Sequence, residues 1–170
     1  ELFDTRTAAI QEGMFTLEAG AMIESGKNID EILERLHYLR DNNKILFVVD
    51  SLRQLIKNGR LSGAAGFVGN ILKIKPFLHV NKEGVIENLD KVRTSKKALK
   101  AIVDYFLEEV KDIDDFIVTL ITSDFPEGEE YVKSEVMKHY PNKEYRTASL
   151  TPVVGCHTAE GVVGLGYFKK

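Results

Sequence analysis

The sequence predicts a mixed α/β fold that contains a β-hairpin and a parallel crossover. A turn at 81–84 separates two apolar runs, which is the pattern of a hairpin. Apolar residues recur at helical spacing after Ser95, which predicts an amphipathic helix. An apolar strand over 115–122, a helix over 126–139 and a strand over 145–150 then predict a right-handed parallel crossover.

Two helices are expected before the first strand. Apolar residues at helical spacing predict a helix over 8–25, and Gly26 follows where a left-handed residue ends many helices. Asn28 is a favourable N-cap for a second amphipathic helix, which is expected to end near Asp41. Two consecutive helices of this kind are typical of the outer layer of an α/β domain.

A short strand and a short helix come next. The apolar, β-branched run over 44–49 predicts the strand. Asp50 is expected to cap a helix that ends near Asn58. Ser62 is then expected to cap a helix of small residues over 63–72, in which three glycines allow another backbone or a ligand to approach closely. These glycines match neither the Walker loop nor the dinucleotide-binding pattern.

The remaining strands are bounded by turn residues. The strand expected over 72–80 contains Pro76, which cannot donate a hydrogen bond to a neighbouring strand. We therefore expect an edge strand or a β-bulge there, with the return strand of the hairpin over 85–92. Near the end of the chain, 151–161 predict a polar elbow, and the glycine-rich run over 162–168 predicts a closing strand.

The composition excludes several classes of protein. At 170 residues the chain is long enough for one domain, or for one domain that carries part of another. A net charge of −3 argues against general attraction to nucleic acid, and the single cysteine, Cys156, excludes a disulfide within the chain. No apolar run reaches the roughly 20 residues that span a bilayer. We therefore predict a reducing, cytoplasmic location without stable membrane insertion.

Positive charge is concentrated around the start of the helix after Ser95. We define this basic patch by four side chains: Lys91, Arg93, Lys96 and Lys97. The lysines at the helix start, and Glu108 and Glu109 at its end, all oppose the helix macrodipole, so helix stability does not explain their order. We expect the basic patch to face an acidic partner or a phosphate group; a merely solvated surface is the alternative.

Four short motifs together resemble the C-terminal domain of the DegV family, which comprises bacterial fatty-acid-binding proteins of the EDD fold. The motifs are N-G-R-L-S at 58–62, L-K-I-K-P at 72–76, K-V-R-T at 91–94 and G-C-H-T at 155–158. They occur in the family's order, and the resemblance covers nearly the whole chain. The chain departs from the family pattern at Asn58, where the family has Gly, and at 159–160, where it has Gly-Pro.

The resemblance also implies a domain organisation. Residues 1–43 correspond to the terminal helices of a truncated N-terminal domain, and 44–170 correspond to the C-terminal domain. Because the chain starts at Glu1 without an initiator methionine or a signal-peptide pattern, we interpret it as a fragment of a larger two-domain protein.

The function that the resemblance implies is non-catalytic binding of a long-chain fatty acid, which some family members present to a separate fatty-acid kinase. No cofactor or metal is implied. The residues expected to hold the carboxylate or an acyl phosphate are Arg60, Ser62, His157 and Thr158, because their side chains can donate hydrogen bonds. The residues expected to line the acyl chain are Phe67, Val68, Ile71, Ile74 and Phe77.

Simpler interpretations stay open for individual residues. Arg60 can pair with Asp50 or bind a carbonyl group, and His157 can be a core histidine whose hydrogen bonds are satisfied. Cys156 is expected to be a small buried group rather than a nucleophile, because no base is placed beside it in the sequence.

Two other functions compete with lipid binding. A hydrolase could use Ser62 and His157 together with Asp50 or Asp124, although the chain lacks the G-x-S-x-G elbow. The second competing function is protein or nucleic-acid binding through the basic segment 91–100. The net charge and the absence of interleaved aromatic residues argue against nucleic-acid binding.

Overall fold

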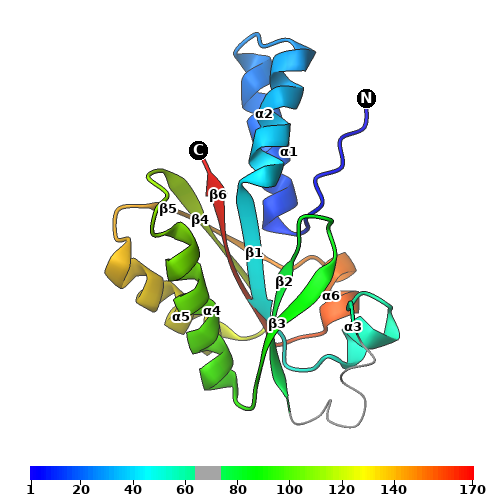
Figure 1. Cartoon of the computed structure of the whole chain (residues 1–170), viewed down its shortest axis with the longest axis vertical. Helices are drawn as coiled ribbons and strands as arrows, with labels where there is room; N and C mark the ends of the chain where they lie inside the picture. Colours follow the sequence, from blue (N-terminus) through cyan, green and yellow to red (C-terminus); the bar gives the residue numbers. More distant parts are fainter. Residues whose placement is uncertain (64–73) are drawn as a thin grey trace.

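The computed structural model describes residues 1–63 and 74–170, which form a mixed α/β fold around one sheet. The described strands follow the order β3-β2-β1-β6-β4-β5 across the sheet (Figure 1). Their bounds are Asn43–Val48 (β1), Lys75–Val80 (β2), Ile86–Val92 (β3), Phe116–Ser123 (β4), Glu144–Ser149 (β5) and Val162–Lys169 (β6). The predicted α/β fold class is confirmed.

The hairpin and the parallel crossover are both present. β2 and β3 pair antiparallel around a turn in which the side-chain oxygen of Asn81 accepts hydrogen bonds from the backbone amides of Glu83 and Val85. β4 and β5 pair in parallel and are joined by α5 (Pro126–His139), which begins at the predicted proline. The last strand, β6, lies in the centre of the sheet, antiparallel to both β1 and β4.

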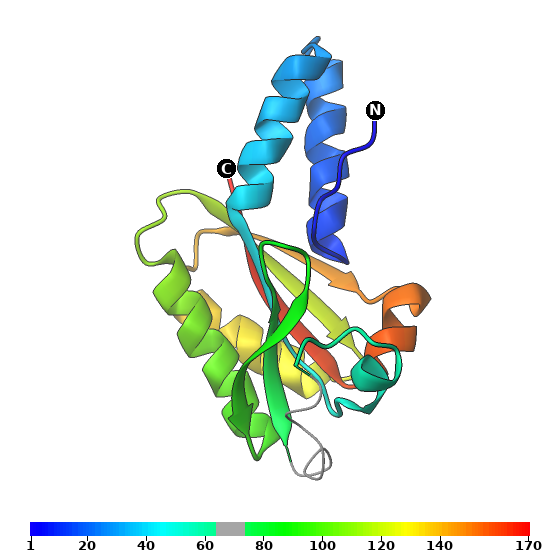
Figure 2. The ribbon, with the colours of Figure 1, turned by 45° about the vertical axis from the view of Figure 1, so that its right-hand side comes forward.

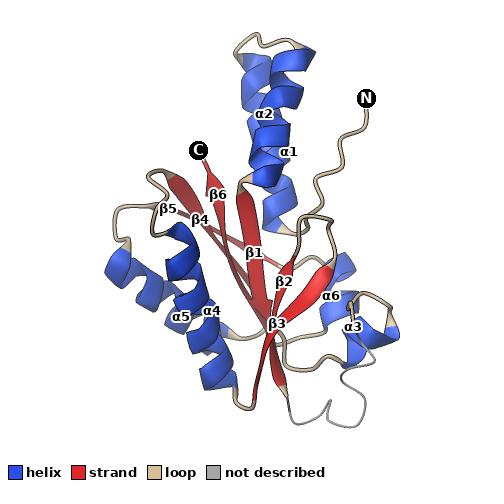
Figure 3. Cartoon of the chain, in the orientation of Figure 1, coloured by secondary structure: helices blue, strands red, loops and turns tan. Residues whose placement is uncertain are grey.

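The helices cover the two faces of the sheet unequally (Figure 3). α4 (Ser95–Val110) packs against β1, β2 and β6, and α5 packs beside it against β4 and β6. The short helices α3 (Arg53–Lys57) and α6 (Pro152–Thr158) lie side by side on the other side of the sheet (Figure 2). α1 (Ile10–Glu24) and α2 (Ile29–Asp41) form a helical hairpin that rises from one end of the sheet.

Apolar burial on both faces stabilises this arrangement. The largest cluster lies between the sheet and the pair α4 and α5, and its fully buried members include Leu46, Ile102, Phe106, Phe116, Leu120 and Leu165. The opposite face carries two smaller clusters, one beneath α3 around Leu52 and Leu55 and one beneath α1 and α2 around Phe15 and Leu39. Each such side chain contributes about 1.5–3 kcal/mol when fully buried.

α1 is attached to the sheet by a buried glutamine. The Gln11 Nε2 group donates hydrogen bonds to the backbone oxygens of Lys44 (2.7 Å) and Tyr167 (3.0 Å), which belong to the neighbouring strands β1 and β6. The amide lies above Gly166, where a side chain would collide with it. The start of α1 therefore packs on the same sheet as the rest of the chain, while the assignment of 1–43 to a separate domain stays a prediction.

The ends of α1 and α2 follow the sequence prediction. Gly26 has a φ of 77°, the left-handed conformation expected after α1. Asn28 caps α2 through a reciprocal pair of hydrogen bonds with Glu31. Within 1–63 and 74–170, none of these helices combines the length and the apolar character required to cross a membrane.

Two predicted helix caps are wrong by a few residues. α3 begins at Arg53, whose backbone amide donates a hydrogen bond to the Ser51 hydroxyl. The Asp50 carboxylate instead forms an ion pair with Lys75. α4 is capped by Thr94 rather than Ser95, because the Thr94 hydroxyl oxygen accepts a hydrogen bond from the amide of Lys97 at 3.2 Å. Thr94 has the geometry that a cap requires, whereas the N-cap position of α3 is Leu52, which makes no side-chain capping bond.

Three other expectations concern the elbow, β2 and the glycine-containing helix, and their outcomes differ. The segment expected as a polar elbow folds into the helix α6, which starts at Pro152. β2 is not an edge strand, but its pairing with β3 has the expected β-bulge: the register shifts between Phe77 and Leu78, and the extra residue is Leu89 of β3. The helix predicted over 63–72 lies almost wholly outside the described residues.

Candidate functional site

The fold brings together two polar motifs that are far apart in the sequence. α3 packs against α6, and the Asn58 Nδ2 group donates a 3.0 Å hydrogen bond to the backbone oxygen of Cys156. The loop that carries Arg60 therefore starts beside the helix that carries His157 (Figure 1). Cys156 itself is exposed, so its expected burial is wrong.

His157 and Thr158 end α6 with different hydrogen-bonding states. The Thr158 side chain is buried, and its hydroxyl lies 3.2 Å from the backbone oxygens of Val154 and Ala159. His157 is half-buried, and its Nδ1 atom is buried without a hydrogen-bond partner among the described residues. His157 is thus not a core histidine with both nitrogens satisfied, and it retains capacity to bind a polar group.

Arg60 and Ser62 are exposed on the loop after α3. The expected alternative of an Arg60–Asp50 pair is wrong, because Asp50 pairs with Lys75 instead. The amide of Ser62 donates a hydrogen bond to the backbone oxygen of Ile86 at 2.9 Å, which attaches this loop to the edge strand β3. The assignment of both side chains to a carboxylate site stays a prediction.

An apolar cavity of about 60 Å³ lies on the sheet face opposite α4 and α5. Its wall is built by β1, β4, β6, the ends of the β2–β3 hairpin, the segment before α1, and α6. Phe47 and Ile121 are typical of its lining, and the Thr158 hydroxyl is the polar side-chain group among the residues that form it. The surface of the cavity is apolar, because the Thr158 hydroxyl is directed at the backbone oxygens of Val154 and Ala159, so the cavity suits an aliphatic group.

The predicted acyl-chain residues do not all reach this cavity. Phe67, Val68 and Ile71 lie outside the described residues, and Ile74 packs against the apolar cluster beneath α3. Phe77 is buried on the opposite face, where its ring meets Tyr105 of α4 edge-on at 5.4 Å. Alternation along β2 explains the difference, because Phe77 pairs with Val48 on the α4 side while Leu78 faces the other way.

The cavity walls were missed because their residues come from many separate segments. Alternating apolar residues in β1 and β4 are visible in the sequence, but they predict only which residues share a face. Gly164 of β6 completes the wall, and its missing side chain leaves room next to Ile121. Residue spacing alone contains no signal that these strands are neighbours.

The backbone is strained directly after α6. Ala159 has a φ of 63° and a ψ of −167°, a conformation that is essentially restricted to glycine. This is the position where the family pattern has glycine, so the alanine adopts the glycine-type backbone and does not change the turn. The strain lies next to the cavity, because Thr158 precedes Ala159.

We expect Ala159→Gly to stabilise the chain by about 1 kcal/mol, because glycine removes most of the steric cost of this conformation but adds chain entropy to the unfolded state. Urea unfolding measures the change. The matched control is Ala101→Gly in α4, where normal helical geometry predicts a loss of about 1 kcal/mol. Equal losses in both variants would show that Ala159 is unstrained.

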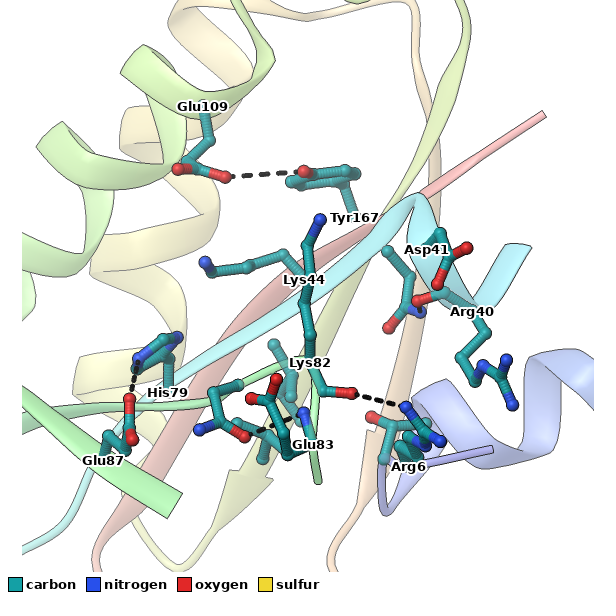
Figure 4. Close-up of a pocket in the computed structure, with 15 residues that line it drawn as sticks. Arg6, Arg40, Asp41, Lys44, His79, Lys82, Glu83, Glu87, Glu109 and Tyr167 are labelled. Carbon is teal, nitrogen blue, oxygen red and sulfur yellow. Dashed lines mark hydrogen bonds and ion pairs between the residues drawn. The ribbon is translucent and has the colours of Figure 1, made fainter. Parts of the chain in front are cut away.

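A second, polar cavity of about 550 Å³ lies between the first residues, the end of α2, the β2–β3 hairpin and the end of α4 (Figure 4). Arg6 Nη1 donates to the backbone oxygen of Lys82 at 3.4 Å, and the Tyr167 hydroxyl lies 3.5 Å from Glu109. Burial, with a smaller contribution from Glu109, raises the pKa of Tyr167 to about 12. The phenol is therefore neutral and donates to the carboxylate near neutral pH.

His79 is a titratable group of this cavity whose protonation is expected to affect the free energy of unfolding. It is buried, and its Nε2 atom lies 3.5 Å from the Glu87 carboxylate on the paired strand β3. Burial, followed by the positive charge of Lys44, lowers the pKa of His79, and Glu87 offsets this only in part. The neutral imidazole is therefore favoured in the folded state.

We expect the free energy of unfolding to fall as the pH drops below about 6.5, because the unfolded chain protonates His79 before the folded chain does. The loss should continue until the pH passes the lowered pKa of the folded state. His79→Gln should reduce this loss between pH 7 and pH 5, as measured by urea unfolding. The matched control is His139→Gln, which makes the same substitution at an exposed histidine.

The basic patch is exposed along the start of α4. Lys91, Arg93, Lys96 and Lys97 all have exposed side chains, and the last two lie in the first turn of the helix. Their charges oppose the macrodipole as the sequence indicates. Residues 1–63 and 74–170 contain no group of three histidine, cysteine or acidic side chains arranged to hold a metal ion.

The fold and these sites place the chain in a known class of α/β proteins. A family model described as "Uncharacterised protein, DegV family" matches residues 1–170. The chain therefore belongs to the DegV family, as its four motifs indicate.

Individual relatives support the same assignment. A DegV domain-containing protein of Clostridium acetobutylicum is 32% identical over 169 residues, which are 99% of this chain and 60% of the relative. The crystal structure of a fatty acid binding DegV family protein from Streptococcus agalactiae superposes with a TM-score of 0.92 at 30% identity, covering 100% of this chain and 60% of that one. DegV of Bacillus subtilis, a fatty acid binding protein, gives 0.85 at 30% identity, covering 99% and 60%. The chain thus spans about 60% of the length of these relatives.

Proposed function

We propose that this chain forms part of a protein that binds a long-chain fatty acid and does no catalysis itself. The observation that carries the proposal is the apolar cavity, which has Thr158 among its lining residues and His157 next to it in the sequence. An acyl chain gains about 0.8 kcal/mol for each buried methylene, so few polar contacts are needed to bind it. The proteins of Streptococcus agalactiae and Bacillus subtilis, both described as fatty acid binding, support the same ligand.

The described cavity accounts for only part of such a ligand. Its 60 Å³ corresponds to about two water molecules at the volume that each occupies in the liquid. It therefore accommodates a short stretch of an acyl chain. The remainder is proposed to lie against other surfaces, including the predicted residues Phe67, Val68 and Ile71.

The proposed head-group site lies at α6. His157 Nδ1 has no partner among the described residues, so it is available to a carboxylate without breaking an existing hydrogen bond. Thr158 reaches the cavity, and its hydroxyl can turn from a backbone oxygen to a ligand. Arg60 and Ser62 are proposed to contribute from the adjacent loop, where both are exposed.

The hydrolase alternative finds little support in the same geometry. A catalytic triad requires an acid that holds the histidine through one ring nitrogen. Asp50 is paired with Lys75, and His157 Nδ1 donates a hydrogen bond neither to Asp124 nor to any other described residue. Binding without chemistry is therefore the function that we propose, and a cytoplasmic location stays a prediction.

Native and denaturing mass spectrometry of the bacterially expressed chain tests the ligand. We expect a mass shift that disappears on denaturation, with release of a free fatty acid, either from this chain or from the longer protein that contains it. The proposal would be contradicted if neither this chain nor the longer protein carries lipid and neither takes up added palmitate.

We further propose that the basic patch faces an acidic partner or a phosphate group, and that a fatty-acid kinase is the partner. The four exposed cations at the start of α4 support this proposal, because their positions bring no benefit to the helix. An exposed surface of this kind can speed association with an acidic protein and set its orientation.

We expect Arg93→Glu to weaken binding to the kinase by about tenfold and to reduce the salt dependence of the remaining binding, because less electrostatic attraction is left to screen, while lipid occupancy stays unchanged. Surface plasmon resonance measures the first effect and mass spectrometry the second. Lys138→Glu, in the last turn of α5 and outside the basic patch, is the charge-reversal control. Loss of lipid from the Arg93 variant would contradict the assignment of this residue to the partner surface.

A further inference from the structure

α6 covers the apolar cavity but is held by few contacts. Val154 and Thr158 face the cavity, whereas Pro152, Val153 and Cys156 are exposed. At each end of the segment, a backbone amide bonds to β4: that of Leu150 to the Thr122 oxygen and that of Gly161 to the Ser123 oxygen. α6 therefore spans the cavity between two fixed ends.

Asn58 supplies the contact that holds the helix between these ends. Its Nδ2 group donates to the Cys156 oxygen at 3.0 Å, across 98 positions of sequence. The last carbonyl groups of a helix have no partner within the helix, so this hydrogen bond satisfies an otherwise free acceptor. In the described part of the chain, the side-chain hydrogen bonds of α6 are this one and the internal bonds of Thr158.

Asn58 is itself held firmly. It ends α3, with its amide bonded to the Gln54 oxygen, and the amides of Gly59 and Arg60 close the same turn. Gly59 has a φ of 63°, so the chain leaves α3 by a glycine turn that fixes the direction of the asparagine. α3 rests on the completely buried Leu52 and Leu55. The side chain thus extends from an anchored helix to a weakly held one.

We propose that Asn58 is a positioning residue, which holds the C-terminal turn of α6 and thereby fixes His157 and Thr158 at the apolar cavity. The ligand role of these two residues rests on the proposed function, whereas the attachment of α6 does not. Asn58 occupies a position where the family pattern has glycine, which carries no side chain. The contact is therefore a property of this chain's own sequence.

Hydrogen exchange tests the attachment without any ligand. Asn58→Asp keeps the shape of the side chain but removes the donor, and Asn142→Asp makes the same charge change at an exposed turn. We expect the α6 amides of Gly155 and Ala159 to exchange about 2- to 10-fold faster in the Asn58 variant, with the His157 ring resonances shifted. Asn58→Ala, which adds no charge, should behave alike.

Two results would overturn the proposal. One is hydrogen exchange of α6 in the Asn58 variant at the same rate as in the Asn142 control. The other is exchange that becomes faster equally in the sheet strands, which would indicate general destabilisation. Palmitate release provides the functional readout, and we expect it to quicken about 2- to 10-fold in the Asn58 variants. Faster exchange with unchanged release would overturn the role of Asn58 at the cavity. If neither the wild-type chain nor the longer protein takes up palmitate, the proposed function fails. Hydrogen exchange and the His157 resonances then test the attachment of α6 by themselves.

Discussion

Gly166→Ala is expected to destabilise the chain by about 3 kcal/mol or more, because its added Cβ atom has no space. That atom would collide with the Lys44 backbone oxygen, and it would lie 2.8 Å from Thr119 Oγ1 and 2.9 Å from Gln11 Nε2. The Lys44 oxygen belongs to the central strand β1, so it cannot move without displacing the sheet. The Gln11 amide would also lose its position between β1 and β6, which leaves a buried polar group without partners.

Urea unfolding monitored by circular dichroism measures this effect. Gly20→Ala is the matched control, since nothing lies within 4 Å of a Cβ atom built at that position of α1. This control should gain about 0.5–1 kcal/mol, because alanine is the better helix former. A Gly166 variant as stable as the wild type would show that α1 does not pack on the sheet as described.

His157→Ala is expected to weaken palmitate binding by about 10-fold or more, if the chain binds fatty acid as we propose. The half-buried ring has an unused Nδ1 atom beside the buried Thr158, and a hydrogen bond to a charged group contributes about 1.5–3 kcal/mol. Because Nδ1 bonds to no other described residue, its removal breaks no internal hydrogen bond. The loss should therefore appear in affinity rather than in stability.

Isothermal titration with palmitate, together with urea unfolding, separates these two effects. His139→Ala removes an exposed histidine at the end of α5 and should change neither quantity. Unchanged affinity in the His157 variant would remove this residue from the head-group site. A large loss of stability would instead indicate that His157 has a structural role.

Local patterns were sufficient for most of the individual elements. α4 was predictable because Leu99, Ile102 and Phe106 recur at helical spacing, and α2 because Asn28 and Glu31 form a capping box. The β2–β3 turn followed from Asn81 and its glycine. These features depend on interactions within a few residues of the chain, which a sequence displays directly. The four motifs likewise were sufficient to identify the family, which the match over 1–170 confirms.

Helix boundaries were less predictable where several polar residues compete. Asp50, Ser51, Thr94 and Ser95 are all chemically capable of capping a helix. Asp50 was available for other contacts, and its pairing with Lys75 depends on β2, which is remote in sequence. For Asp50 a tertiary contact therefore competes with capping, whereas Thr94 caps α4 through a local hydrogen bond to the amide of Lys97.

The candidate site was predictable only in part, because it depends on strand order. Arg60, Ser62, His157 and Thr158 were named from their motifs, but their proximity follows from the packing of α3 on α6. Phe77 was assigned to an acyl pocket because it is apolar, whereas its register with Val48 turns it toward α4. A shift of one residue along a strand reverses the face of every side chain, so composition cannot settle this point.

The sequence by itself thus determined the α/β class, the hairpin, the parallel crossover and the family, because each depends on local spacing or on short motifs. Only the tertiary structure decided that β6 lies between β1 and β4, that α6 covers an apolar cavity, and that Asn58 reaches the Cys156 oxygen. These features join residues that are far apart in the sequence. They arise from strand pairing and packing, which are set by the free energy of the whole chain rather than by any one segment.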